Sequence, residues 1–87
     1  MKTLFVMVKC ELGAADRVGN TIVDKSDGGG EVEVYSITGN YDLLVKTHFT
    51  EVDEIAAYVQ TFIHTIPGVK ETYTFVSFRA YGHFSVF

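Results

Sequence analysis

The spacing of apolar positions changes several times along the 87 residues, and each change marks an expected element. Residues 3–10 are apolar without helical gaps, which predicts a strand covered on both faces. The apolar residues then recur at spacings of three and four, so an amphipathic helix is expected over residues 13–26. A second amphipathic helix is expected after Thr50, where a pattern like a capping box begins, and the Pro-Gly pair at 67–68 ends it.

Two further apolar runs lie in the middle of the chain. Residues 32–38 and 41–49 have β-forming character and are separated only by Gly39 and Asn40, which predicts a tight hairpin turn. A last strand is expected over residues 71–79, whose apolar side chains fall on both faces. The tail, residues 80–87, is too apolar for a solvated end, and we expect it to strap a dimer or to join further copies.

The expected order is strand, helix, strand, strand, helix, strand in one domain, residues 1–87. This is the plan of an α+β, ferredoxin-like βαββαβ sandwich with a four-stranded antiparallel sheet. Two helices can cover only one face of that sheet, although its first and last strands are apolar on both. A second copy is the simplest cover for the other face, so the sequence predicts a face-to-face dimer, a dimeric α/β barrel.

Charge and cysteine content narrow the possible partners. The chain has 7 basic and 11 acidic side chains and a formal charge of -4, which argues against direct binding to DNA or RNA. The single cysteine, Cys10, excludes an intramolecular disulfide and is expected to be a small buried residue in a reducing compartment. The sequence shows neither a signal-peptide pattern nor a run long enough to span a bilayer, so a cytoplasmic protein without membrane contact is expected. The glycine triplet at 28–30 is interpreted as a plain connection.

The most distinctive chemistry lies beside the expected hairpin turn. Asp42 follows a loop that contains Gly39, and the backbone N–H groups of such a loop can point at a ligand. Donors beside a fixed carboxylate suit a small zwitterion, because the donors bind its carboxylate and the aspartate binds its ammonium group. The alternative interpretation is a hairpin turn without a ligand.

Two segments then resemble a known family. The runs Val-Tyr-Ser-Ile-Thr-Gly-Asn-Tyr-Asp-Leu-Leu-Val-Lys at 34–46 and Ile-Pro-Gly-Val-Lys-Glu-Thr-Tyr-Thr at 66–74 resemble the effector-binding module, or RAM domain, of the Lrp/AsnC transcription regulators. The resemblance implies dimers that assemble into octamers or other rings, with a small ligand, typically a free amino acid, bound between dimers near the hairpin loop. By position it implies ligand contacts from Gly39, Asn40, Tyr41, Asp42, Thr72 and Thr74.

One departure from that family affects the expected role. Full-length members carry an N-terminal helix-turn-helix domain, whereas here the effector module begins within a few residues of Met1. Unless the chain is a fragment, it resembles a stand-alone RAM protein that does not bind DNA directly. Three roles remain open: an amino acid sensor, a partner that mixes into rings of full-length Lrp/AsnC regulators, or a modulator of an enzyme.

The alternative from another class is a small cofactor-free dimeric α/β barrel enzyme of the monooxygenase or isomerase type. His48 shares a strand face with Asp42, and His64 is expected to be a solvated helix residue. No nucleophile has an orienting base, and no histidine spacing suits a metal. A pocket inside the subunit lined by His48 or Tyr73 would favour the enzyme, and a polar cleft at the hairpin loop would favour the sensor. We expect a non-enzymatic amino acid-binding oligomer without cofactor or metal, and a structural assembly adaptor is the third hypothesis.

Overall fold

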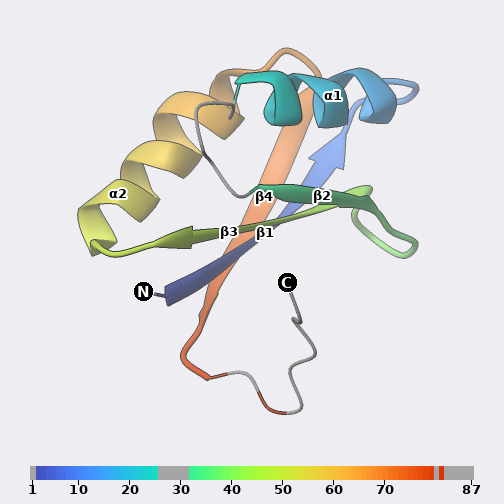
Figure 1. Cartoon of the computed structure of the whole chain (residues 1–87). Helices are drawn as coiled ribbons and strands as arrows, with labels where there is room; N and C mark the ends of the chain where they lie inside the picture. Colours follow the sequence, from blue (N-terminus) through green and yellow to red (C-terminus); the bar gives the residue numbers. More distant parts are fainter. Residues whose placement is uncertain (1, 26–31, 80, 82–87) are drawn as a thin grey trace.

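The computed structural model describes residues 2–25, 32–79 and 81 (Figure 1). All four strands pair antiparallel in one sheet of order β2-β3-β1-β4. The elements in chain order are β1 (Lys2–Cys10), α1 (Ala15–Lys25), β2 (Glu33–Ser36), β3 (Leu43–Phe49), α2 (Val52–Ala57), a π-helical turn η1 (Tyr58–Phe62), a 3-10 turn η2 (Ile63–Thr65) and β4 (Val69–Ser77). The predicted ferredoxin-like βαββαβ fold is confirmed.

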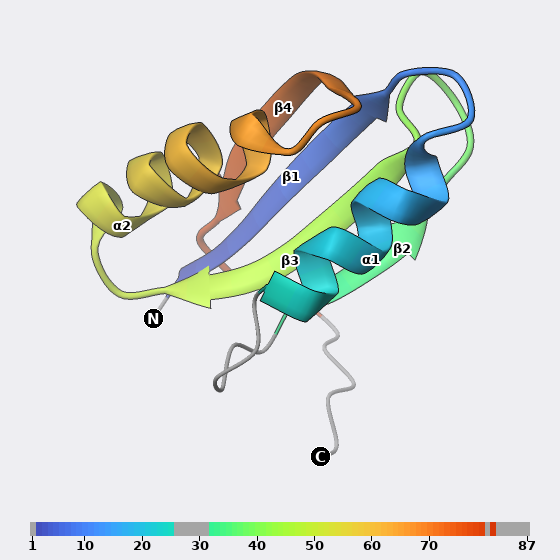
Figure 2. The same cartoon turned by 90° about the horizontal axis from the view of Figure 1, so that it is seen from above.

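Both helices lie on the same face of the sheet (Figure 2). The core between the two layers contains alternate residues of β1 and β3 together with one stripe from each helix. Burial of each such aliphatic side chain stabilises the fold by about 1.5–3 kcal/mol. The fully buried members are Leu4, Val6, Val8, Val18, Ile22, Val45 and Ile63.

The other face of the sheet has no cover within the described chain. The strand register aligns Tyr35, Leu44, Met7 and Tyr73 in one row across all four strands. Next to this row, the ring of Phe75 stacks on the ring of Phe5, its register partner on β1, and the ring centroids are 5.3 Å apart. Tyr73 is 57% exposed and Phe75 is 40% exposed, so a single chain leaves apolar surface open here. The first and last strands, β1 and β4, therefore carry apolar side chains on both faces, as expected, but one of these faces is uncovered.

The hairpin between β2 and β3 is present, but its turn is longer than predicted. The backbone N–H of Ile37 donates to the carbonyl of Asp42 at 3.0 Å, so residues 38–41 form the connection. The predicted two-residue turn at Gly39 and Asn40 is therefore wrong. The reason is that the N–H of Asp42 pairs with Val8 of β1 at 2.9 Å, which holds Asp42 against β1.

The second helix also differs from the expected regular helix. It begins one residue later than predicted, with Glu51 as N-cap, and the Glu54 carboxylate accepts a hydrogen bond from the backbone N–H of Glu51 at 3.4 Å. The π-helical turn adds a residue to one turn and rotates the preceding segment relative to the following one. Tyr58 is therefore half-buried, whereas Val52, in the first turn of α2, is 69% exposed.

The expectations for the glycine triplet and for most of the apolar tail concern residues outside the described ranges. Within those ranges no helix is both long and apolar enough to cross a membrane.

Candidate functional site

The loop between β2 and β3 lies against the end of β1, where two hydrogen bonds that involve side chains hold it in addition to the backbone bond from Asp42 to Val8. The Lys9 ammonium donates to the carbonyl of Asn40 at 2.8 Å, and the backbone N–H of Cys10 donates to Oδ2 of Asp42 at 2.8 Å. Asp42 is half-buried, and its Oδ1 accepts no hydrogen bond from the described residues. One carboxylate oxygen therefore fixes the loop to β1, and the other remains available.

Gly39 gives this loop an open backbone. Its φ of +106° lies in the left-handed region that favours glycine, and no atom lies within 4 Å of the position that a Cβ would take. A ligand can therefore approach the main chain closely at this point. The exposure of Gly39 and Asn40, together with the half-buried Tyr41, leaves the predicted ligand loop accessible.

The backbone N–H of Cys10 holds Asp42, and the thiol of the same residue lies in surroundings that lower its reactivity. Its side chain is buried, and this burial raises the pKa of the thiol above its ordinary value. The carboxylate of Asp42 raises the pKa further, and the Arg17 guanidinium opposes both effects. The expectation of a small buried cysteine is confirmed, and the thiol at this position is not an activated nucleophile.

The two candidate threonines lie on a different strand from the loop. Thr72 pairs with Val8 and Thr74 pairs with Val6, so β1 separates both threonines from β3. The hydroxyl of Thr72 is 2.6 Å from Nε2 of His64, the exposed residue that was predicted to be solvated. Within one chain the structure therefore brings together the four loop residues but does not bring the threonines to them.

Lys9 was missed in the sequence interpretation. In the sequence Lys9 lies near the end of an apolar strand, and no residue close to it in the chain indicates a contact with Asn40, 31 residues away. The antiparallel register of β1 with β3 brings it to the loop. A cation therefore contacts the loop that carries the candidate carboxylate, and a lysine near the end of the first strand was the available signal.

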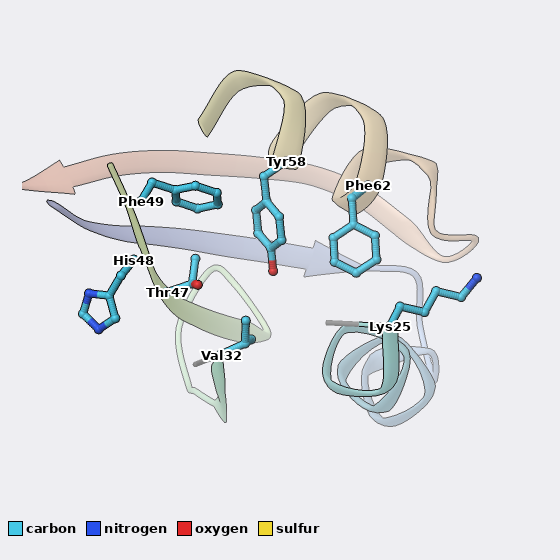
Figure 3. Close-up of a pocket in the computed structure, with 7 residues that line it drawn as sticks. All are labelled: Lys25, Val32, Thr47, His48, Phe49, Tyr58 and Phe62. Atoms are coloured by element: carbon cyan, nitrogen blue, oxygen red, sulfur yellow. The ribbon is translucent and has the colours of Figure 1, made fainter. Parts of the chain in front are cut away.

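A separate pocket of about 320 Å³ opens between the two helices at the far end of β3 (Figure 3). It is lined by Lys25, Val32, Thr47, His48, Phe49, Tyr58 and Phe62. Figure 3 shows the His48 ring on the opposite side of β3 from Thr47, and Nδ1 of His48 lies 3.3 Å from the hydroxyl of Thr3. His48 thus borders the pocket without directing its imidazole into it. The pocket predicted for an enzyme is thus present in that His48 lines it, but the imidazole is not directed into the pocket, where a substrate would lie.

The fold and the loop together define a small α+β domain with an accessible loop, the predicted ligand site, at one end of its sheet. The sequence model of the "Lrp/AsnC ligand binding domain" matches residues 3–86. The chain therefore belongs to the Lrp/AsnC ligand-binding domain family, and the resemblance seen in the two sequence segments is confirmed.

Two curated relatives are transcription regulators. The chain is 30% identical over 77 residues to the "HTH-type transcriptional regulator FL11" of Pyrococcus horikoshii, and 29% identical over 77 residues to the protein of that name in Pyrococcus abyssi. In both cases the match covers 88% of this chain and 48% of the relative. The chain thus spans about half the length of the curated relatives it matches.

Solved structures show the same fold. The protein TTHA0845 from Thermus thermophilus has a TM-score of 0.81 and 32% identity, with 95% of this chain and 100% of that chain covered. The transcriptional regulator NMB0573 of Neisseria meningitidis, solved as a complex with L-Met, has a TM-score of 0.78. That match covers 99% of this chain and 55% of the regulator at 16% identity, so it concerns the fold alone.

Proposed function

We propose that this domain is a regulatory effector-binding protein that binds a small amino acid-like zwitterion at the loop of residues 37–42. The observation that carries the proposal is the presence of two opposite charges at this loop, one on the loop itself and one on β1. The Asp42 carboxylate is fixed through Oδ2, while the Lys9 ammonium contacts the carbonyl of Asn40. A free amino acid carries the complementary pair of charges, and charge-assisted hydrogen bonds are the stronger ones.

Each group has a defined part in this proposal. Oδ1 of Asp42 accepts a hydrogen bond from the ligand's ammonium group. The ligand's carboxylate is bound by Lys9 and by backbone N–H groups around Gly39, where the positive φ and the empty space permit close approach. Fixing Asp42 before binding lowers the entropic cost of ordering the site.

The proposal includes an assembly, because the ligand site of one chain is shallow and the sheet has an open face. The row of Tyr35, Leu44, Met7 and Tyr73 packs against the same row of a second copy in a twofold dimer. Dimers then associate into a ring through their loop ends, with the ligand between them. In that arrangement a hydroxyl such as that of the exposed Thr74 reaches the ligand from a neighbouring copy.

The comparisons support the regulatory role and the ligand class. The curated relatives are named transcription regulators, and a protein of the same fold was solved with L-Met. We propose accordingly that the domain acts in the cytoplasm without catalysis, and that other copies and full-length regulators of the same family are its partners.

The test is a thermal-shift screen of the purified protein against the twenty amino acids, with native mass measured beside it. A ligand present at about one hundred times its Kd stabilises the native state by roughly 2.7 kcal/mol. We expect a clear shift with one or a few amino acids. The methyl ester and the deaminated acid of each hit serve as controls, and both should fail because each lacks one of the two charges.

A screen without any hit, on a protein whose native mass shows an intact ring, would contradict amino acid binding and favour the assembly adaptor. A hit whose deaminated analogue binds equally well would contradict the role given to Asp42.

A further inference from the structure

The pocket between the helices is remote from the loop that the proposed function uses. β3 begins beside the loop at Leu43 and ends at the pocket with Thr47 and Phe49. At about 3.4 Å per residue, the strand between these points spans roughly 15–20 Å. Any ligand in this pocket is therefore a different ligand from the one bound by the loop.

Three aromatic rings form one continuous wall of the pocket. The ring of Tyr58 lies between Phe49, at a centroid distance of 5.3 Å, and Phe62, at 5.1 Å, and both pairs are tilted. Tyr58 and Phe62 are the first and last residues of the π-helical turn, an uncommon conformation that is frequent at functional sites. Such a wall suits a flat apolar ligand, because a further ring can continue the tilted packing.

The floor of the pocket contains a polar group without a partner in the part of the chain that the structure describes. Thr47 is only 5% exposed, and its hydroxyl forms no hydrogen bond with the described residues. Every fully enclosed side-chain oxygen or nitrogen of the described residues has a hydrogen-bond partner. Because the Thr47 oxygen has none, it is not fully enclosed, and we infer that it reaches the open space of the pocket. Figure 3 places this hydroxyl on the side of β3 that faces the aromatic rings. A buried hydroxyl costs free energy unless something binds it.

The rim of the pocket carries one positive charge. Among the described lining residues, Lys25 in the last turn of α1 carries a full positive charge, and none is acidic. Figure 3 shows its chain beside Phe62, with the ammonium at the outer end. A ligand that is apolar in the middle and anionic at its outer end therefore matches the walls and the rim.

We propose that this pocket is a second ligand site, which binds a small aromatic molecule that has a hydroxyl at its inner end and a carboxylate at its outer end. The ring packs on the wall of Phe49, Tyr58 and Phe62. The inner hydroxyl pairs with Thr47, and the carboxylate meets Lys25. The volume permits this, because an apolar cavity of about 150 Å³ already holds a benzene molecule and this pocket has about 320 Å³.

The experiment uses 4-hydroxyphenylacetate as the probe, titrated into the whole protein and followed by calorimetry and methyl NMR. At about 5 mM probe even a site with a Kd of 1 mM is mostly occupied. We expect one probe per chain, with the largest shifts at the methyl groups of Val32 and Thr47. Tyramine, which has the same ring and hydroxyl but a positive end, should bind more weakly.

Two variants separate the inner and outer contacts. Thr47→Val keeps the shape of the side chain and removes the hydroxyl. It should lower the affinity for the probe roughly fivefold but leave the affinity for phenylacetate, which has no ring hydroxyl, unchanged. Lys25→Gln should lower the affinity for both the probe and phenylacetate by roughly two- to fivefold, and by less at high salt. Lys70→Gln, at an exposed lysine on β4, is the matched control and should have no effect.

Thr47→Val also has an expected effect on stability that a purely structural threonine would not give. Since its hydroxyl has no partner among the described residues, replacing it by a methyl group should raise the unfolding midpoint while the affinity for the probe falls. Absence of probe binding at about 5 mM in the wild-type protein would overturn the proposal, as would unchanged affinity in both variants. Loss of probe binding in Asp42→Asn would also overturn it, because the probe would then occupy the loop site. Failure of amino acids to bind the loop, with probe binding intact, would instead contradict only the proposed function.

Discussion

Gly68 and Gly39 offer a matched test of the packing described for this fold. Both have nearly the same backbone conformation, with φ of +105° and +106°. They differ in what an added methyl group would meet. At Gly39 it would meet nothing within 4 Å, whereas at Gly68 it would lie 2.7 Å from Nη2 of Arg17, 3.0 Å from Cβ of Ala14 and 3.2 Å from Cγ2 of Val18. The two alanine substitutions therefore share one cost and differ in another.

The shared cost is the left-handed backbone, about 1–2 kcal/mol for an L-residue. Gly39→Ala should lose only this much. Gly68→Ala should lose roughly 1–3 kcal/mol more, because overpacking a tight contact displaces its neighbours. The Arg17 guanidinium can move, although it then gives up its 2.7 Å hydrogen bond to the carbonyl of Pro67. The Cβ of the buried Ala14 moves only with the backbone that leads into α1.

The assay is urea unfolding followed by far-UV circular dichroism, at one protein concentration because the proposed assembly would contribute to stability. We expect equal m-values and a midpoint order of wild type, Gly39→Ala, Gly68→Ala. Adding Ala14→Gly to Gly68→Ala should recover part of the loss, seen as a favourable coupling in the double-mutant cycle. Equal losses for the two alanine variants would refute the packing of the 67–68 turn against α1.

Three further predictions rest on other parts of the molecule. Gly19→Ala should stabilise the protein by up to about 1 kcal/mol in the same urea assay, because alanine is the better helix former and its Cβ would lie 3.6 Å from Leu43, an ordinary contact. Tyr73→Glu should convert the proposed dimer to monomers in native mass spectrometry, since it places charge in the open sheet face; an unchanged mass would contradict that interface. The raised pKa of Cys10 implies that its contribution to stability is complete below about pH 8.5 and is lost as the pH rises through the folded-state pKa. Cys10→Ala should lack this alkaline loss, and parallel pH profiles for the two proteins would refute it.

The regular part of the fold could be predicted from the sequence because its signals are local. Alternating burial along β1 and the stripe of Val18 and Ile22 follow directly from strand and helix periods. The apolar spacing of α1 likewise predicts which side of the helix faces the sheet, and a Cβ placed at Gly19 would lie 3.6 Å from Leu43 of β3.

The parts that could not be predicted depend on contacts between distant segments. Nothing near residue 42 indicates that its N–H and carboxylate bind β1, and this pairing lengthens the turn. Similarly, the π-helical turn of Tyr58–Phe62 leaves no mark in the spacing of apolar residues, yet it directs Tyr58 inward. The loop half of the candidate site was identified from sequence, while Lys9 required the strand register.

Asp42 provides the most direct test of the central proposal, because its two oxygens have separate roles. Asp42→Asn keeps an oxygen to accept the hydrogen bond from Cys10 but removes the charge, whereas Asp42→Ala removes both. We expect Asp42→Asn to unfold like the wild type and Asp42→Ala to lose about 1–3 kcal/mol through the unpaired N–H group. The decisive measurement is the Kd of Asp42→Asn for the amino acid found in the screen, by calorimetry. The proposal predicts a loss of roughly ten- to a hundredfold, as for a hydrogen bond to a charged group. Wild-type affinity in this variant would mean that Asp42 only holds the loop, and would contradict the site as proposed.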